Sequence, residues 1–380
     1  MNQRDNMFDQ VIERRHSHST KWQKFAPDVL PFWVADMDFA APEGILEAVK
    51  ARLAHPILGY TDRPASLNDA FHSWLQRHFN WSIPDTWVVW IPGVVPGLNL
   101  AAQTLSSDQE LIIPTPVYHP FFDLAANAGI GEHQVPCLPD EAGVWQFDWS
   151  AMQRVLSPAC RMLAISNPQN PTGRCYSHQE LSQLADYVAS NNLLLVSDEI
   201  HANIILDETT EHIPIAKAFP QIAKQTITLM AATKTFNIPG LSCAAAIIPD
   251  AELREQFLAA RKGLLPGIGP LGFAAAQAAF EEDSSWLPQL LAQLRANYHT
   301  LQAALGERVA PLEATYLAWI RVDDVIGRLS ADAAEDYFAQ HGLGISPGAQ
   351  FGDDRYIRFN FGCPPATLQE GLLRLRKALS

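Results

Sequence analysis

Apolar residues are grouped along the chain in short runs, and segments with helical periodicity lie between them. The runs are rich in Val, Ile and Leu, as is typical of strands buried on both faces, and they cover residues 87–91, 110–113, 162–166, 193–197, 226–230 and 244–248. Segments such as residues 179–190 carry apolar residues at spacings of three and four, which is the period of one helix face. Strands that alternate with helices predict an α/β fold with a mostly parallel central sheet covered by helices.

A second, smaller α+β unit is predicted from the two ends of the chain. A long helical segment, residues 284–306, would connect the sheet to a C-terminal part in which residues 316–322 and 356–360 are typical of strands. We therefore expect residues 1–45 to join this small domain, residues 46–284 to form a large domain, and residues 285–380 to form the small C-terminal domain. Pro42 and Glu43 predict a helix start with Pro in its first turn.

The composition is that of a folded protein with an excess of negative charge. Hydrophobic residues make up 48% and charged residues 18% of the 380 residues, which favours globular structure throughout. The net charge of −14 would repel a nucleic-acid backbone. Residues 1–6 are polar, and the chain has no apolar run of about 18 residues that could cross a membrane. We expect a cytoplasmic protein that binds neither nucleic acid nor a membrane.

Three features could indicate other chemistry, but their contexts argue against it. Five cysteines at irregular intervals suit neither a disulfide framework nor a zinc site, and we expect them to be reduced and buried. His16 and His18 lie in a polar segment without the further ligands that a metal site needs, so no metal is predicted. Residues 267–272 match G-x-G-x-x-G, but they follow a helical segment rather than a strand, which favours a flexible loop over a dinucleotide-binding turn.

Four loops that follow predicted strands carry groups with possible binding chemistry. Residues 92–97, Pro-Gly-Val-Val-Pro-Gly, join a strand to a helix start, where free N–H groups favour an anion. Asn170 lies in a loop with two Asn-Pro steps, Asp198 ends a strand, and Lys234 follows the next strand. Taken singly, each also suits an ordinary turn or a surface residue. A buried carboxylate, however, needs a cationic partner, and a lysine near a desolvated site can become nucleophilic.

The four loops are expected to meet, because the carboxyl ends of strands in an open α/β sheet form one ligand-binding edge. Together they would offer an anion cradle, an amide, a carboxylate and a reactive amine. Pyridoxal 5′-phosphate uses all four, through its phosphate, phenolic oxygen, ring nitrogen and aldehyde. The combination therefore predicts a site for this cofactor.

The same motifs resemble those of a known family. Asn-Pro-Thr-Gly at 170–173, Ser-Asp-Glu at 197–199 and Thr-Lys-Thr at 233–235 are similar to the class I/II aminotransferases, which are fold-type I pyridoxal-phosphate enzymes. The separations of 198 − 170 = 28 and 234 − 198 = 36 residues agree with that family. Further motifs resemble the MalY/PatB-type branch of cystathionine (cysteine-S-conjugate) β-lyases, and they are Trp-Val-Ala-Asp-Met-Asp-Phe at 33–39, Gly-Tyr-Thr at 59–61, Asp-Glu-Ile-His at 198–201, Lys-Thr-Phe-Asn-Ile-Pro at 234–239 and Arg-Phe-Asn-Phe-Gly-Cys-Pro at 358–364.

The resemblance implies roles at the cofactor. Lys234 would hold the cofactor covalently and act in catalysis, Asp198 would keep the ring nitrogen protonated, and Asn170 would hydrogen-bond the phenolic oxygen. The other implied cofactor contacts are Tyr118 stacked on the ring, His201 near Asn170, and the N–H groups of Val94 and Val95 with Thr233 at the phosphate.

The resemblance also implies how substrate is bound. Arg358 would hold the substrate α-carboxylate as a bidentate fork, with Ala35 and Asn170 as further substrate contacts. Tyr60 would act in catalysis by reaching the active site of a neighbouring subunit, which implies a homodimer with shared active sites.

The implied reaction is α,β-elimination of L-cystathionine or a related cysteine S-conjugate to thiol, pyruvate and ammonia. Ser242 occupies the position eight residues after Lys234 where many aminotransferases have an arginine, and this departure favours the lyase. Transamination is the alternative, because the cofactor and the lysine serve both reactions. A regulatory binding protein that retains the fold is a third possibility, against which the intact Lys234, Asp198 and Arg358 argue.

Overall fold

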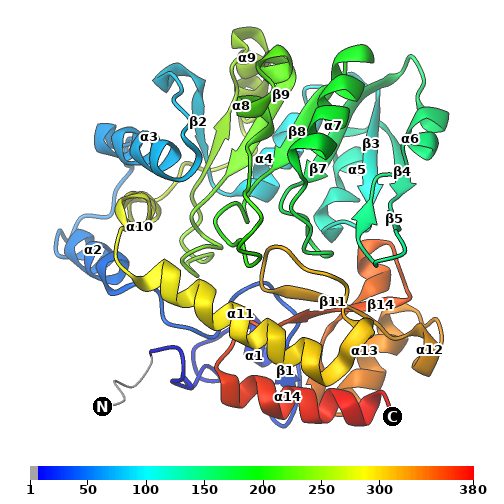
Figure 1. Cartoon of the computed structure of the whole chain (residues 1–380). Helices are drawn as coiled ribbons and strands as arrows, with labels where there is room; N and C mark the ends of the chain where they lie inside the picture. Colours follow the sequence, from blue (N-terminus) through cyan, green and yellow to red (C-terminus); the bar gives the residue numbers. More distant parts are fainter. Residues whose placement is uncertain (1–6) are drawn as a thin grey trace.

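The main sheet has seven strands and is mostly parallel. The computed structural model describes residues 7–380, so residues 1–6, where the predicted N-terminal segment begins, lie outside the described part. The strands are β2 (Val88–Ile91), β3 (Glu110–Thr115), β4 (Gly131–Pro136), β7 (Cys160–Ser166), β8 (Leu194–Asp198), β9 (Thr226–Met230) and β10 (Ala244–Ile247). Their order is β2-β10-β9-β8-β7-β3-β4, and only β10 runs antiparallel to its neighbours (Figure 1). The predicted α/β fold is confirmed.

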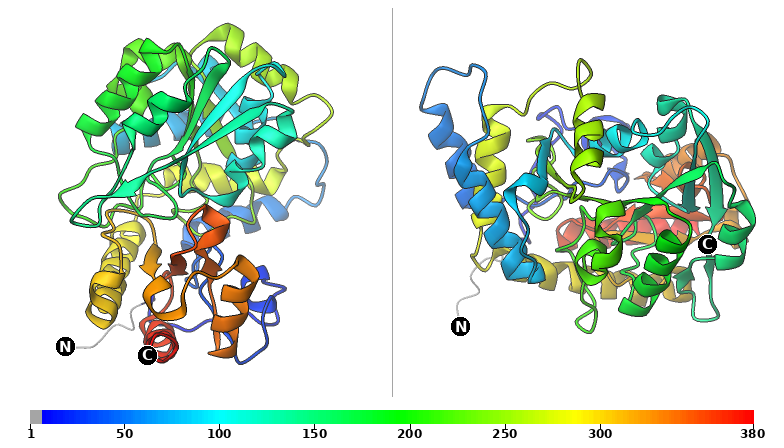
Figure 2. Two further views of the ribbon diagram at one scale, coloured as in Figure 1. Left: turned by 90° about the vertical axis from the view of Figure 1, so that its right-hand side faces the viewer. Right: turned by 90° about the horizontal axis from the view of Figure 1, so that it is seen from above.

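Both faces of this sheet are buried under helices (Figure 2). Along β7, Met162 and Ala164 belong to one apolar cluster, whereas Leu163 and Ile165 belong to another. This division follows from the two-residue period of a strand. The first cluster includes side chains of α4 (Val94–Ala102), α5 (Leu124–Ala128) and α9 (Ala251–Ala260), and the second includes those of α6 (Trp149–Val155), α7 (His178–Ser190) and α8 (Ile215–Ala218).

The two ends of the chain come together in a second group of elements. Strand β1 (Leu30–Pro31) pairs in parallel with β12 (Leu343–Gly344), which ties the N-terminal segment to the C-terminal part. A three-stranded antiparallel sheet contains β11 (Leu317–Arg321), β14 (Tyr356–Asn360) and β13 (Ser346–Pro347). In Figure 1 these blue and orange-to-red segments lie together below the main sheet. The domain boundaries near residues 45 and 284 stay a prediction.

The remaining helices connect or cover these sheets. Helix α10 (Pro270–Glu281) packs against both α2 (Glu43–Leu53) and α3 (Ala65–Phe79), and α11 (Trp286–Leu305) packs on α14 (Pro365–Ala378). Pro42 precedes α2 rather than lying in its first turn, which corrects the predicted start by one position. The other elements are α1 (Thr20–Gln23), β5 (Leu138–Pro139), β6 (Trp145–Gln146), α12 (Asp323–Ile326) and α13 (Ala331–Gln340).

Several predictions from the sequence can be compared directly with this fold. Residues 267–269 lie in the loop between helices α9 and α10, so the G-x-G-x-x-G match is not a strand-to-helix turn. All five cysteines are free, and all except the half-buried Cys137 are buried. None of the helices within residues 7–380 is long and apolar enough to cross a bilayer.

Candidate active site

The four predicted loops meet at a cavity beside the carboxyl ends of the parallel strands. The cavity has a volume of about 240 Å³. Its walls include every residue predicted to contact the cofactor, namely Val94, Val95, Tyr118, Asn170, Asp198, His201, Thr233 and Lys234. The expectation that these groups converge is therefore confirmed, while their roles in binding remain proposals.

One wall of the cavity is the amino end of α4. Gly93 precedes this helix with a φ of 132°, a conformation that residues with a Cβ rarely adopt. Inside the helix, a Cβ on Gly97 would lie 2.5 Å from Ile91 Cδ1, so only glycine lets α4 approach the sheet this closely. Val94 and Val95 begin the helix, so their N–H groups have no intrahelical partner, and both residues line the cavity together with Thr233, an arrangement that favours an anion.

Asp198 is a buried carboxylate without a cationic partner among residues 7–380. It is the last residue of β8 and is 4% exposed. Its Oδ1 accepts a hydrogen bond from the Ile200 N–H at 3.1 Å, and no described lysine, arginine or histidine forms an ion pair with it. Burial raises its pKa to about 7, although the Ile200 N–H and Lys234 oppose the shift. A ligand that carries a protonated ring nitrogen would supply the missing cation.

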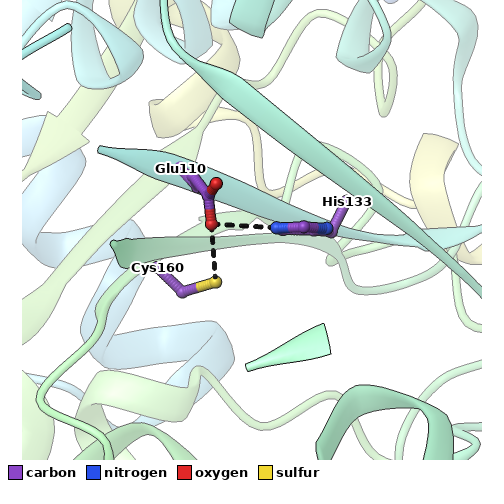
Figure 3. Close-up of side chains that lie close together, drawn as sticks. All are labelled: Glu110, His133 and Cys160. Atoms are coloured by element: carbon purple, nitrogen blue, oxygen red, sulfur yellow. Dashed lines mark hydrogen bonds and ion pairs between the residues drawn. The ribbon is translucent and has the colours of Figure 1, made fainter. Parts of the chain in front are cut away.

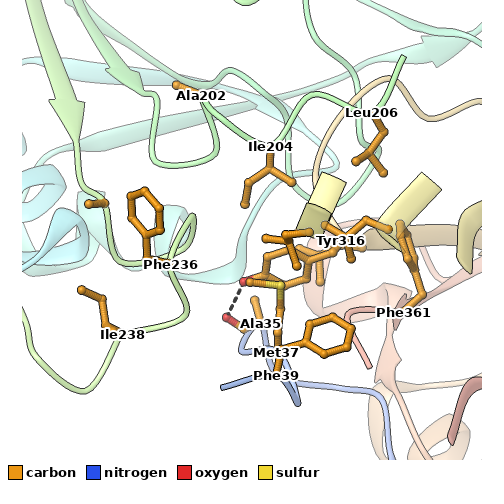
Figure 4. Close-up of a cluster of buried hydrophobic side chains, with 14 of the residues drawn as sticks. Ala35, Met37, Phe39, Ala202, Ile204, Leu206, Phe236, Ile238, Tyr316 and Phe361 are labelled. Atoms are coloured by element: carbon orange, nitrogen blue, oxygen red, sulfur yellow. Dashed lines mark hydrogen bonds between the residues drawn. The ribbon is translucent and has the colours of Figure 1, made fainter. Parts of the chain in front are cut away.

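Lys234 points its amine into the same cavity. Its Nζ donates a hydrogen bond to the Ala35 carbonyl at 2.5 Å, and that carbonyl also accepts one from the Tyr316 hydroxyl at 3.0 Å (Figure 4). Burial and the nearby Arg358 lower the pKa of Lys234 to about 8, against the opposing effect of Asp36 and Asp198. An amine with this pKa can lose its proton near neutral pH and act as a nucleophile or a base.

Two asparagines, for which the sequence predicted no role, hold the segment that carries Ala35. Asn237 accepts a hydrogen bond from the Met37 N–H at 2.8 Å and donates to the Met37 carbonyl at 2.9 Å. From the other side, Asn360 Nδ2 donates to the carbonyls of Val34 and Asp36 at 2.6 and 2.7 Å. The segment that carries the Ala35 carbonyl is thus held from two sides, by the loop after β9 and by strand β14. Both asparagines stand inside motifs noted in the sequence, yet only the fold shows what they contact.

Arg358 lies in the wall of a second cavity, of about 480 Å³. This cavity shares Ala35, Tyr118 and Lys234 with the first, so the two meet at the lysine. The Arg358 guanidinium donates to Asn170 Oδ1 at 2.9 Å and to the Trp33 carbonyl at 2.8 Å. Its Cζ atom lies 4.6 Å from the centre of the Phe351 ring.

The Arg358 guanidinium is suited to a bound anion. The side chain is 3% exposed, its buried Nε has no hydrogen-bond partner, and within residues 7–380 no carboxylate pairs with it. Burial lowers its pKa to about 10, which still leaves it charged at neutral pH. A buried cation beside a cavity and without an anion is costly, and a carboxylate of the ligand would relieve that cost.

His201 and Tyr118 complete the wall near the lysine. The His201 ring is buried, and its Nδ1 has no partner among the described groups. Burial, reinforced by Lys234 and Arg358, lowers the pKa of His201 to about 3, so this ring is neutral. Tyr118 faces both cavities, and burial raises the pKa of its hydroxyl. Both rings can therefore contact a ligand without adding charge.

Tyr60 is the one predicted site residue that this chain does not bring to the cavities. It lies fully exposed between helices α2 and α3 and lines neither cavity. That Tyr60 reaches a neighbouring active site stays a prediction.

Comparison with known proteins gives full-length matches. The family model described as aminotransferase class I and II matches residues 27–375. Cystathionine β-lyase PatB of Bacillus subtilis is 33% identical over 388 aligned positions, which cover 98% of this chain and 100% of PatB. The crystal structure of OvoB superposes with a TM-score of 0.93 at 37% identity and covers 98% of this chain and 99% of OvoB. The pyridoxal-phosphate-bound C–S lyase from Staphylococcus hominis has a TM-score of 0.90 at 30% identity and covers 98% of this chain and 97% of that enzyme.

Proposed function

The chain belongs to the aminotransferase class I and II family, and we propose that it is a pyridoxal-phosphate-dependent lyase that cleaves the C–S bond of L-cystathionine or related cysteine S-conjugates. The single observation that carries the proposal is the meeting of two cavities at Lys234. One is lined by the groups that suit the cofactor, and the other contains a buried arginine that suits an amino-acid carboxylate. The relatives named as cystathionine β-lyase and C–S lyase match over nearly the whole chain and support this reaction class.

The cofactor is pyridoxal 5′-phosphate, and the first cavity fits it. Among the described residues no cation pairs with the buried Asp198, and the protonated ring nitrogen would provide one. The amino end of α4 suits the phosphate, Tyr118 can cover the ring, and the Lys234 amine can react with the aldehyde. When bound, the cofactor supplies an electron sink for the electron pair left on the substrate Cα.

Residues around the second cavity bind the substrate carboxylate and remove the Cα proton. Arg358 grips both oxygens of the substrate carboxylate and thereby fixes Cα beside Lys234. The freed Lys234 amine takes the Cα proton. The Cβ–S bond then breaks, the sulfur leaves as a thiolate that takes up a proton, and the released 2-aminoacrylate is hydrolysed by water to pyruvate and ammonia. The second cavity accommodates the group on sulfur.

The active protein is a homodimer in which Tyr60 completes the site of the partner subunit. Ile57, Leu58 and Tyr60 are exposed on one loop, and clustered apolar side chains of this kind mark interaction surfaces. Mixing the inactive variants Tyr60→Ala and Lys234→Ala tests the arrangement. If Tyr60 acts across the interface, each mixed dimer has one intact site, and activity recovers to roughly a quarter of the parent value after subunit exchange. Mixtures that stay inactive, although mixed dimers have formed, would contradict it.

A cytoplasmic location is consistent with the five free cysteines, because reducing compartments keep thiols unpaired.

Product analysis distinguishes the lyase from a transaminase. Purified protein is incubated with L-cystathionine alone, and separately with an amino acid and a keto-acid acceptor. The lyase forms pyruvate, ammonia and thiol in the first reaction, without an acceptor. Transfer of the amino group in the second reaction, without thiol in the first, would overturn the proposal.

A further inference from the structure

Three side chains with metal-binding atoms lie close together (Figure 3). Their strand positions place them at the end of the main sheet opposite to the catalytic cavity. Glu110 begins β3, Cys160 begins β7, and His133 is the third residue of β4. These strands are neighbours in the order β7-β3-β4, and Glu110 pairs directly with Cys160. The catalytic groups follow the carboxyl ends of the parallel strands, whereas Glu110 and Cys160 stand at the amino ends. The cluster is therefore independent of the proposed function.

The ligand atoms are already spaced almost as a metal ion would hold them. His133 Nε2 lies 2.9 Å from Glu110 Oε2, Cys160 Sγ lies 3.5 Å from the same oxygen, and all three atoms lie within 4.8 Å of one another. Tetrahedral zinc with ordinary bond lengths would separate such atoms by about 3.3 to 3.6 Å. Shifts of about an ångström or less in side-chain position would bring the trio to that geometry.

The surroundings of the trio favour a bound cation over a tightly closed cluster. Cys160 is 3% exposed, but the side chains of Glu110 and His133 are 29% and 31% exposed, so an ion can enter from solvent. Ser157 donates its hydroxyl to Glu110 Oε2 at 2.9 Å and its N–H to Cys160 Sγ at 3.5 Å. Hydrogen bonds of this kind from outside the ligand set orient metal ligands and stabilise their anionic forms.

The backbone also makes room for the carboxylate. Gly131 pairs with Glu110 across β3 and β4, and a Cβ there would lie 2.9 Å from Glu110 Cγ. Glycine at this position lets the Glu110 side chain pass over β4 toward His133.

We propose that Glu110, His133 and Cys160 form a site for Zn²⁺, with water in the fourth position. A thiolate, an imidazole and a carboxylate are the three ligand types that zinc takes in proteins, and three protein ligands leave one position for water. Thiolate favours zinc over magnesium or calcium. On binding, Cys160 loses its thiol proton to solvent, and no oxidation or reduction takes place. The ion would link β7, β3 and β4 at the edge of the sheet.

The test uses untagged, cofactor-loaded protein that has been stripped of metal with EDTA and dialysed. Zinc binding is measured by competition with a chromophoric chelator for the parent, Glu110→Gln, His133→Gln and the control His299→Gln. His299 is an exposed histidine on α11 and is not part of the cluster. Thermal unfolding of each protein in EDTA shows whether the substitution itself changes the fold.

We expect the parent and His299→Gln to bind one Zn²⁺ per chain with the same Kd. In Glu110→Gln and His133→Gln the Kd should rise at least about tenfold, since each variant loses a direct ligand. Zinc should raise the Tm of the parent and leave that of His133→Gln unchanged. Absence of zinc uptake by the parent, or equal Kd values in all four proteins, would overturn the proposal and leave the three side chains as a hydrogen-bonded cluster. Neither result would bear on the lyase activity.

Discussion

Replacing Arg358 by lysine separates recognition of the substrate carboxylate from simple attraction by charge. The guanidinium is held by Asn170 and by the Trp33 carbonyl, so its fork has a fixed direction in the wall of the second cavity. Lysine keeps the charge but offers a single nitrogen on a flexible stem. The variant therefore loses one of two charge-assisted hydrogen bonds, each worth about 1.5–3 kcal/mol. If that bond is fully formed in the transition state, kcat/KM falls by about 10- to 150-fold.

The assay is the rate of pyruvate formation from L-cystathionine, with cofactor content and Tm measured on the same samples. Arg355→Lys is the matched control, because Arg355 lies close by in sequence, pairs with Asp353 at 2.6 Å, and lines neither cavity. That pair is partly exposed, so the control should lose less than about fivefold in kcat/KM. Parent-like kcat/KM in Arg358→Lys would refute the assignment of Arg358 to the carboxylate. A loss matched by the control would refute it as well.

Three further substitutions test other contacts. Asp198→Asn should keep the fold and lower kcat/KM by about a hundredfold or more, because a neutral amide cannot stabilise a ring cation by charge; near-parent turnover would remove Asp198 from this role. In cofactor-free protein, the contribution of Lys234 to the free energy of unfolding should rise between pH 8 and 10.5, because the folded pKa of Lys234 is lowered to about 8 from 10.5 and the unfolded chain binds more protons at this residue in that window; the buried cysteines, whose pKa burial raises, act in the opposite direction. Lys234→Met should abolish up to about 3 kcal/mol of this rise in denaturant titrations, and an unchanged slope would contradict the lowered pKa. Asn360→Ala should lower the free energy of unfolding by about 1–3 kcal/mol, because it removes the acceptor of the buried Gly362 N–H, whereas the carbonyls of Val34 and Asp36 keep hydrogen bonds from the Asp36 N–H and from Lys21; an unchanged free energy of unfolding would contradict this.

The sequence predicted the central strands well because they are buried on both faces. The strand expected at residues 226–230 is β9 without change, and the other five predicted strands differ from the structure by one to two residues at their ends. Strand β4 was missed because it lies at the edge of the sheet and carries Glu132, His133 and Gln134, so no continuous apolar run marks it.

The candidate site was predictable where its residues follow strand ends, since parallel strands bring their carboxyl ends to one edge. Asn237 and Asn360 could not be assigned in this way, because their partners are distant backbone groups. The partner of Asn237 lies 200 residues away in sequence, and that of Asn360 lies 326 residues away. The cluster of Glu110, His133 and Cys160 also could not be predicted from the sequence. Its spacing matches no metal-binding motif, and only the strand order brings the three side chains together.

Graded borohydride reduction of the cofactor-loaded protein tests most directly whether Lys234 carries the cofactor and catalyses C–S cleavage. Each sample is divided between peptide mapping and the assay of thiol and pyruvate released from L-cystathionine. The labelled lysine should be Lys234, and activity should fall in proportion to its labelling and vanish at one label per chain. Labelling of another lysine, or thiol release that persists once Lys234 is fully labelled, would contradict the proposed function.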